Sequence, residues 1–147
     1  MATRSRIGIE LKDGSILSAY HHWDGYPEWL GRILNTHYNA KSLVEELIDG
    51  GDMSTCWTDE RWTGDRWGSY PTKVEEYGPQ YYSQRGEDSP PVMHNDLNDF
   101  LVYTDDNSGG EYAYHFANGK WVCHQVQNYR DPNVVKEVSI PEGALAV

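Results

Sequence analysis

The stretch EYAYHFANGKWVCHQV, residues 111–126, constrains the fold more than any other part of the sequence. Asn118 and Gly119 both tolerate positive φ, and alternating runs rich in aromatic residues flank them on either side. This pattern predicts a β-hairpin with a type I′ turn. Counting outward from the turn gives the expected cross-strand pairs: Phe116 with Trp121 and Tyr114 with Cys123 on one face, His115 with Val122 and Ala113 with His124 on the other.

A second hairpin is predicted near the N-terminus, over residues 6–23. Apolar residues alternate with polar ones along 6–12 and 15–23, and Asp13-Gly14 is typical of a two-residue turn of the primed type. Successive side chains of a strand point to opposite faces of the sheet. His21 and His22 are therefore expected on opposite faces, where they cannot serve one site.

Two helices are predicted to follow, over residues 28–38 and 42–49. Pro27 suits the first turn of a helix, and Gly50-Gly51 suits a helix end. Each segment carries an apolar stripe at helical spacing: Trp29, Leu30, Ile33, Leu34 and Tyr38 in the first, and Leu43, Val44, Leu47 and Ile48 in the second. We expect the pair to pack on one sheet face.

The rest of the chain is less regular in pattern. Residues 52–92 are rich in Trp, Tyr and turn formers, and Trp57, Trp62 and Trp67 recur at a spacing of neither helix nor strand, which predicts a long irregular region. Residues 97–127 are expected to form the C-terminal strands, with a short helix over 95–106 leading into them, and the tail, residues 138–147, to form an edge strand or an extension. Together these features predict one α+β domain over 1–147, a mostly antiparallel sheet built from two β-hairpins with a pair of short helices on one face.

The charge of the chain limits its partners. Its 147 residues carry 23 acidic and 12 basic side chains, a formal net charge of −11. Proteins that bind polymeric nucleic acid or anionic membranes need clustered Lys and Arg, so neither partner is expected. A small nucleotide-like molecule, a basic surface on a host protein, or a second copy of the chain are the partners that this composition allows.

The sequence also bears on location. Its first residues contain no apolar signal core, and no window approaches a membrane span, so we expect a cytoplasmic protein. Cys56 and Cys123 are then expected to be reduced thiols rather than a disulfide.

The stretch YHHWDGYP, residues 20–27, is the first candidate site. A bend after the strand would gather Tyr20, His22, Trp23, Asp24 and Tyr26, which offer stacking surfaces, an imidazole and a carboxylate. Asp24 can accept from donors of a base or a sugar. The alternative is structural: Asp24 caps the following helix or an Asx-turn, and the rings belong to the core.

The second candidate lies among the tryptophans and arginines of residues 57–85. Arginines beside aromatic rings suit an anionic ligand that carries a ring, and Arg85 is the residue we expect to meet a phosphate. The alternative is a solvated loop whose tryptophans pack on the core.

Motifs for other chemistries are missing from the sequence. We predict no metal site, because six histidines occur without C-x-x-C, H-x-x-x-H or HExxH spacing. We predict no cofactor and assign no catalytic residue, because neither a nucleophile elbow nor a phosphate-binding loop is present. Acid–base chemistry by Asp24 or Glu28 with a histidine stays an alternative.

Two segments resemble a family of small bacteriophage proteins, some from phages of cyanobacteria. YHHWDGYPEWLG, with a helix ending in His37-Tyr38, and SLVEELIDGGDMST resemble that family's Y-x-H-W-D-G-Y-P run and its second helix ending in G-D-x-S. The similarity covers residues 15–55 and continues through YYSQRGED around residues 82–88. There Ser83 and Gln84 stand where relatives have a Tyr-His-Arg run before R-G-E-D.

This resemblance and the candidate site lead to three hypotheses. The first is a phage accessory protein that sequesters a nucleotide-like signal of the infected bacterium in its cytoplasm, without catalysis, as an anti-defence sponge. The second is an acidic inhibitor that covers a basic surface of a host protein. The third is an enzyme that degrades such a signal.

Overall fold

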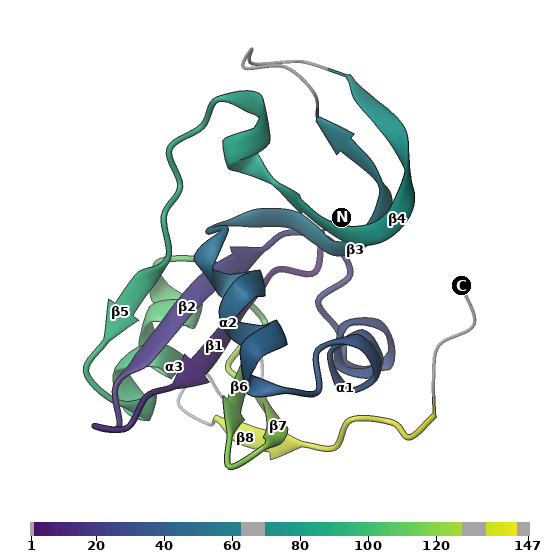
Figure 1. Ribbon diagram of the computed structural model, residues 1–147. Helices are drawn as coiled ribbons and strands as arrows, with labels where there is room; N and C mark the ends of the chain where they lie inside the picture. Colours follow the sequence, from purple (N-terminus) through teal and green to yellow (C-terminus); the bar gives the residue numbers. More distant parts are fainter. Residues whose placement is uncertain (1, 63–69, 128–134, 144–147) are drawn as a thin grey trace.

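A mixed β-sheet forms the centre of the chain in the computed structural model, which describes residues 2–62, 70–127 and 135–143 (Figure 1). Within these residues the strands run β4-β3-β2-β1-β6-β7-β8 across the sheet, and β5 also pairs with β2. The bounds are β1 Ser5–Glu10, β2 Ile16–His21, β3 Met53–Trp62, β4 Pro71–Tyr81, β5 Val92–His94, β6 Tyr112–Ala117, β7 Lys120–Gln125 and β8 Lys136–Val138.

The α+β class is confirmed, but the sheet is not built only of antiparallel hairpins. β1 and β6 pair in parallel from Ser5 opposite Tyr112 to Ile9 opposite Phe116, and β2 pairs in parallel with β3 at His21 opposite Met53. Helices lie between the strands of both parallel pairs in the sequence, as parallel pairing requires a crossover. Turn residues specify local hairpins, whereas nothing in the sequence pattern specifies how the two hairpins join.

Both predicted hairpins are present. All four pairs expected around Asn118-Gly119 are found, and the φ values of 53° and 77° at these residues confirm the type I′ turn. The N-terminal turn differs from prediction, because only Gly14 has positive φ. Ser15 N–H donates to Asp13 Oδ1 at 3.0 Å, and Gly14 N–H donates to Leu11 O at 3.0 Å, so the turn begins one residue earlier.

The predicted helix pair covers one face of the sheet. It consists of a π-helical turn, η1 (Pro27–Gly31), which leads into α1 (Arg32–His37), and of α2 (Lys41–Asp49). Their apolar stripes pack on alternate residues of β1, β2 and β6, among them Ile7, Ala19 and Tyr114. The larger core lies in this layer, between the helices and the sheet.

A third helix, α3 (Leu97–Asp106), covers the opposite face (Figure 1). Asp96 caps it by accepting from the backbone N–H of Asp99 at 2.8 Å. Phe100 packs into a smaller cluster with Ile16 and Ala113. The short helix considered for this segment therefore exists, and it helps to form the candidate site described below.

The region predicted to be irregular contains the longest strands. β3 and β4 form a long hairpin that arches beyond the sheet in Figure 1, followed by the 3-10 turn η2 (Tyr82–Arg85). The prediction failed because register shifts between Met53 and Glu60 break the alternation of the strand. The guanidinium of Arg61 supports the distorted segment by donating to Thr58 O, Glu60 O and Glu76 O. Trp67 lies outside the described residues.

Of the predicted tail, residues 138–147, the described part has only Val138 in a strand, and residues 139–143 form none, so this part is an extension rather than an edge strand. β8 pairs with β7 through Cys123–Val138, His124–Glu137 and Gln125–Lys136, and no described strand pairs with its other side. Residues 144–147 lie outside the described residues.

Candidate functional site

The YHHWDGYP stretch leaves β2 and divides its side chains between the two sheet faces. His21 is fully buried on the face of the helix pair, where the backbone N–H of Cys56 donates to its Nε2 at 3.1 Å. Burial lowers the pKa of His21 to about 3, so its ring is neutral at physiological pH. His22 faces the opposite side and is only half-buried. The predicted separation of the two histidines is therefore found.

The bend itself is structural. Asp24 has a φ of 54°, and Gly25 lies between the segment that precedes β1 and strand β6, with hydrogen bonds to both. Gly25 N–H donates to Thr3 O at 2.8 Å, and its carbonyl accepts from the Tyr114 hydroxyl at 2.7 Å. A Cβ at this position would lie 2.6 Å from Ser5 Oγ. Asp24 is not the helix cap, because the N-cap of η1 is Tyr26 and no side chain caps it.

Two arginines and two rings lie side by side on the face that also carries α3. Arg4, Arg6, Tyr20 and His22, called here the arginine face, occupy alternate positions at one end of the β1–β2 pair. A hydrogen bond of 2.7 Å joins the Tyr20 hydroxyl to Nδ1 of His22. Burial raises the pKa of Tyr20 to about 12, partly offset by the two arginines. Burial, and then the charge of Arg4, lower the pKa of His22.

Arg6 is the central residue of this face. Its side chain is buried, with a residue exposure of 3%, and it makes no ion pair with a described carboxylate, although burial lowers the pKa of Arg6 and the charge of Asp52 at the same hollow partly offsets this. Nε and Nη2 donate to the hydroxyl and carbonyl of Ser18, and Nη1 donates to Ser108 Oγ. The guanidinium also lies 5.0 Å from the centre of the Tyr103 ring. Three of its five N–H groups are thus used, which leaves two for another acceptor.

Two adjacent hollows open over the arginine face. The Arg6 hollow, of about 280 Å³, is lined by Arg6, Tyr20, Asp52, Tyr103, Asn107 and Ser108. The Trp23 hollow, of about 540 Å³, is lined by residues that include Arg4, His22, Trp23, Glu111 and Gln127. The Tyr20–His22 hydrogen bond and the neighbouring residues Ser108 and Gly109 connect the two.

Trp23 provides an accessible ring beside this cationic face. It is 46% exposed, and the His22 ring meets it edge-on with the ring centres 4.5 Å apart. A ring that is free on one side, close to Arg4, is the arrangement that binds a planar base next to an anionic group. Tyr20, His22 and Trp23 are therefore the predicted residues that the structure brings together.

The other three predicted residues lie outside these hollows. Asp24 and Tyr26 line neither, and the pKa of Tyr26 is raised by desolvation and by the Asp24 carboxylate, so the two are near each other. Arg85 pairs with Glu87 and packs over the rings of Trp62 and Tyr82, 4.6 and 5.0 Å from their centres. Its expected encounter with a phosphate has no support from this geometry.

Arg6, Asp52 and Tyr103 were missed by sequence reasoning. Asp52 Oδ1 accepts from the backbone N–H of Tyr20 at 2.9 Å, and burial raises the pKa of Asp52. The signal for Arg6 was available, because an arginine stands within the predicted strand Arg6–Lys12, which alternates with buried isoleucines. Asp52 and Tyr103 come from other segments, and only the tertiary fold brings them to the face.

A serine and a histidine meet below Arg6 without forming a catalytic pair. Ser18 Oγ lies 2.7 Å from His94 Nε2, and burial, with the charge of Arg6, lowers the pKa of His94 to about 4. Ser18 is fully buried, lines neither hollow, and accepts from Arg6 Nε at 2.9 Å. A nucleophile needs access to its substrate. This network therefore positions Arg6.

Metal and thiol chemistry find no support in the described part of the chain. His115 and His124 pair at 3.2 Å on one sheet face, but no group of three or more His, Cys, Asp or Glu residues there is placed to hold a metal ion. Cys56 and Cys123 are free and buried, and burial raises the pKa of both thiols, that of Cys123 to about 12. Thiols in such surroundings are unreactive.

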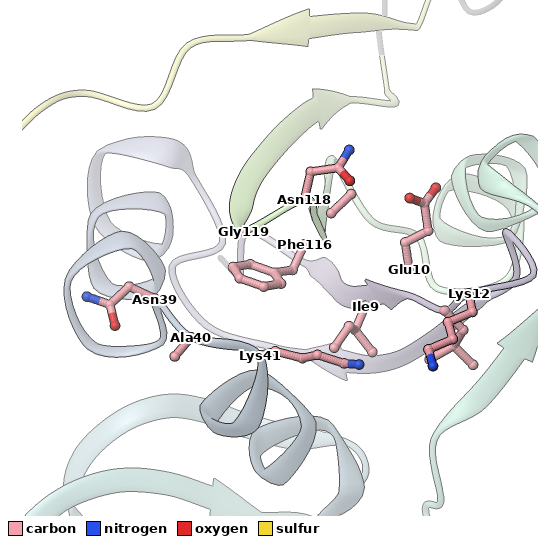
Figure 2. A pocket seen from close by; sticks show the side chains of 11 residues that line it. Ile9, Glu10, Lys12, Asn39, Ala40, Lys41, Phe116, Asn118 and Gly119 are labelled. Carbon is pink, nitrogen blue, oxygen red and sulfur yellow. The ribbon is translucent and has the colours of Figure 1, made fainter.

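A further hollow of about 440 Å³ lies at the other end of the sheet (Figure 2). Ile9 and Phe116 form its apolar floor, with Lys12 and Lys41 at its rim. Lys41 lies 3.7 Å from Glu45, and Glu10 is beside Lys12; unlike Arg6, both lysines are exposed. None of the predicted site residues lines this hollow. We therefore place the candidate site at the arginine face.

Among the described residues, no helix is long and apolar enough to cross a membrane. Comparison with protein-family models, curated proteins and solved structures gives no match to this chain.

Proposed function

We propose that this protein binds and sequesters a small nucleotide-like ligand at the arginine face, without converting it. The observation that carries the proposal is Arg6. Arg6 is a buried cation with no ion pair to a described carboxylate, and the charge of Asp52 at the same hollow offsets its burial only in part, so a further charged or strongly polar partner would stabilise it. Two unused N–H groups beside an open hollow offer that partner a place, and a phosphate is the anion that a guanidinium binds best.

The neighbouring residues support a nucleotide over a simple anion. Trp23 and His22 present ring surface, and Glu111 and Gln127 at the same hollow can accept from the donors of a base. Arg4 adds a second positive charge at the hollow that Trp23 lines. A ring, hydrogen-bonding groups and two arginines together match the parts of a nucleotide.

The absence of turnover is proposed from what surrounds the face. Among the described residues, the titratable groups that line the Arg6 hollow are Arg6, Tyr20, Asp52 and Tyr103, and those that line the Trp23 hollow are Arg4, His22 and Glu111. Asp52 already accepts from a backbone N–H, and the raised pKa of Tyr20 keeps its phenol neutral. The Tyr20 phenol is therefore not set up as a general base, and Nδ1 of His22 is already engaged by the Tyr20 hydroxyl. With the resemblance to small bacteriophage proteins, this favours a sponge that removes a nucleotide signal in the cytoplasm of an infected bacterium.

The test is a screen for ligands followed by variants. The purified chain is denatured and the released molecules are identified by mass spectrometry, while nucleotides are added back in a thermal-shift series. Arg4→Gln should abolish retention with little change in melting temperature, because Arg4 is exposed. Lys12→Gln, which removes an exposed cation far from the face, is the matched control. Equal retention by both variants would refute the site.

An inhibitor of a basic host protein is the second candidate. Residues 71–77 of β4 are all exposed, at the edge of the sheet, and include Glu75 and Glu76 against one lysine, Lys73. Such an acidic edge suits a basic partner surface. Co-purification with a host protein that Glu75→Lys/Glu76→Lys disrupts, while nucleotides are not retained, would favour this function.

A further inference from the structure

A third hollow continues the candidate site along the flank of α3. This Asn98 hollow, of about 470 Å³, lies between β5 and α3 and is lined in part by Met93, Asn95, Asn98, Asp99 and Val102. Tyr103 and Asn107 line both this hollow and the Arg6 hollow. The three hollows therefore form a row, with Arg6 in the middle.

The volumes of the three hollows indicate which part of a ligand each could hold. Pockets that hold small molecules measure roughly 300–1,000 Å³. The Arg6 hollow, at about 280 Å³, is below this range and suits a single group such as a phosphate. The Asn98 and Trp23 hollows, at about 470 and 540 Å³, are each within it.

The two end hollows offer the same kinds of contact. In the Asn98 hollow, Met93 and Val102 are 55% and 50% exposed and provide apolar surface for a flat ring, as Trp23 does at the other end. Each end also carries a carboxylate with amide side chains, Asp99 with Asn95 and Asn98, and Glu111 with Gln127. Carboxylates and amides read the N–H and carbonyl groups on the edge of a base.

Positive charge, in contrast, is found at the middle and toward one end. Arg6 lines the middle hollow, with Asp52 on the same lining, and Arg4 lines the Trp23 hollow with Glu111, whereas no Lys or Arg of the described residues lines the Asn98 hollow, which carries Asp99. Anionic groups of a ligand therefore belong at the middle, and its neutral rings at the ends.

We infer that the ligand is a dinucleotide, whose linking phosphate meets Arg6 and whose two bases occupy the Trp23 and Asn98 hollows. This inference rests on the proposed function and specifies its ligand. One base and one phosphate would fill only two of the three hollows. The flank of α3 from Asn98 to Asn107 spans about 14 Å, at about 1.5 Å per helical residue, so the row is longer than one base.

Calorimetric titration of the whole chain tests the inference. The probes are guanosine monophosphate, the linear guanine dinucleotide and its cyclic form, with the adenine counterparts. Linking two groups that bind separate hollows should make a dinucleotide bind about a hundredfold tighter than the corresponding mononucleotide. The linear and cyclic probes distinguish the two ways in which the bases can be joined.

Two variants address the ends separately. Trp23→Ala and Val102→Asp should each weaken dinucleotide binding about tenfold or more, since each removes the contacts of one base. Mononucleotide binding should change little in either variant, because the other end stays available. Val74→Asp, which adds the same charge at an exposed valine of β4, is the control for Val102→Asp.

The outcomes separate the two proposals. If mononucleotides bind as tightly as dinucleotides and Val102→Asp acts like Val74→Asp, the dinucleotide inference is overturned while the nucleotide-binding function stands. If no probe binds, both are overturned. Preference for a dinucleotide that both end variants remove supports the inference.

Discussion

The hydroxyl of Tyr20 lies 2.7 Å from Nδ1 of His22, two positions further along the chain. This bond ties the last regular residues of β2 to the loop that carries Trp23, and so fixes the His22 ring between the Arg6 and Trp23 hollows. A hydrogen bond at this position links the rigid sheet to the part of the site that we expect to contact a base.

Tyr20→Phe should therefore weaken both stability and ligand retention, by modest amounts. Loss of a partly buried hydrogen bond costs about 0.5–1.5 kcal/mol in the free energy of unfolding. Urea denaturation measures that cost, and titration measures retention. Tyr70→Phe, at an exposed tyrosine, is the control and should change neither. A wild-type free energy of unfolding for Tyr20→Phe would mean that the bond does not form in solution.

Stability should fall on acidification because of His21. Its pKa is about 3 in the folded chain, against an ordinary value of 6.5 that applies to the unfolded chain. Below pH 6.5 the unfolded chain therefore binds a proton that the folded chain does not. His94, with a pKa of about 4, acts in the same direction, while the raised pKa of Asp52 opposes both. Because of His21, the free energy of unfolding therefore falls as the pH is lowered from about 6.5 to 3, by up to about 1.4 kcal/mol per pH unit.

His21→Gln isolates this contribution, because glutamine keeps an acceptor near the Cys56 N–H. Urea denaturation at pH 7.5, 6 and 5 should give a shallower loss of stability for the variant than for the wild type. Parallel curves would show that His21 does not differ between the folded and unfolded states.

How far the sequence predicts this fold depends on whether the information is local. The type I′ turn at Asn118-Gly119 fixed a whole hairpin and its register, because two residues with positive φ leave few alternatives. The β3–β4 hairpin was missed because its bulges remove the alternation by which a strand is recognised. The parallel β1–β6 pair was missed because strand order is set by tertiary packing.

The candidate site shows the same division. Strand alternation correctly separated His21 from His22, which is a local property. Tyr20 lines the Arg6 hollow together with Arg6, Asp52 and Tyr103, which lie on three other segments of the chain. Trp23 and Asp24 were expected at one site because they are neighbours in sequence, but the positive φ of Asp24 turns the chain between them.

The N-terminus of α2 offers a stabilising substitution. Ala40 is its N-cap residue, in an extended conformation with φ −134° and ψ 147°, and its side chain cannot accept from the first N–H groups of the helix. Ala40→Ser should raise the free energy of unfolding by about 0.5–2 kcal/mol. Ser42→Ala, inside the helix, is the control and should not produce this gain. An unchanged denaturation midpoint for Ala40→Ser would show that these N–H groups already have partners.

Arg61 should determine the order of the β3–β4 hairpin. Its guanidinium supplies hydrogen bonds to Thr58 O, Glu60 O and Glu76 O, where the strands are out of register. A Cβ at Gly78 would lie 2.7 Å from Nη2 of Arg61 and displace it. Arg61→Gln and Gly78→Ala should both speed amide exchange in residues 71–77, while leaving exchange in β1 and β2 unchanged. Slow exchange in 71–77 of both variants would contradict this role.

Trp23→Ala should separate binding from folding. Trp23 is 46% exposed and makes its ring contact with His22, so its removal should cost much less than the roughly 3–5 kcal/mol typical of a buried tryptophan. Trp121→Ala should show that full cost, because Trp121 is 8% exposed and its Nε1 donates to Tyr38 O at 2.8 Å. Denaturation and nucleotide titration on both variants test this contrast. We expect Trp23→Ala to keep a melting temperature close to the wild type and to bind the dinucleotide about tenfold or more weakly. If it unfolds as Trp121→Ala does, the Trp23 ring is part of the core and the base-binding role is wrong.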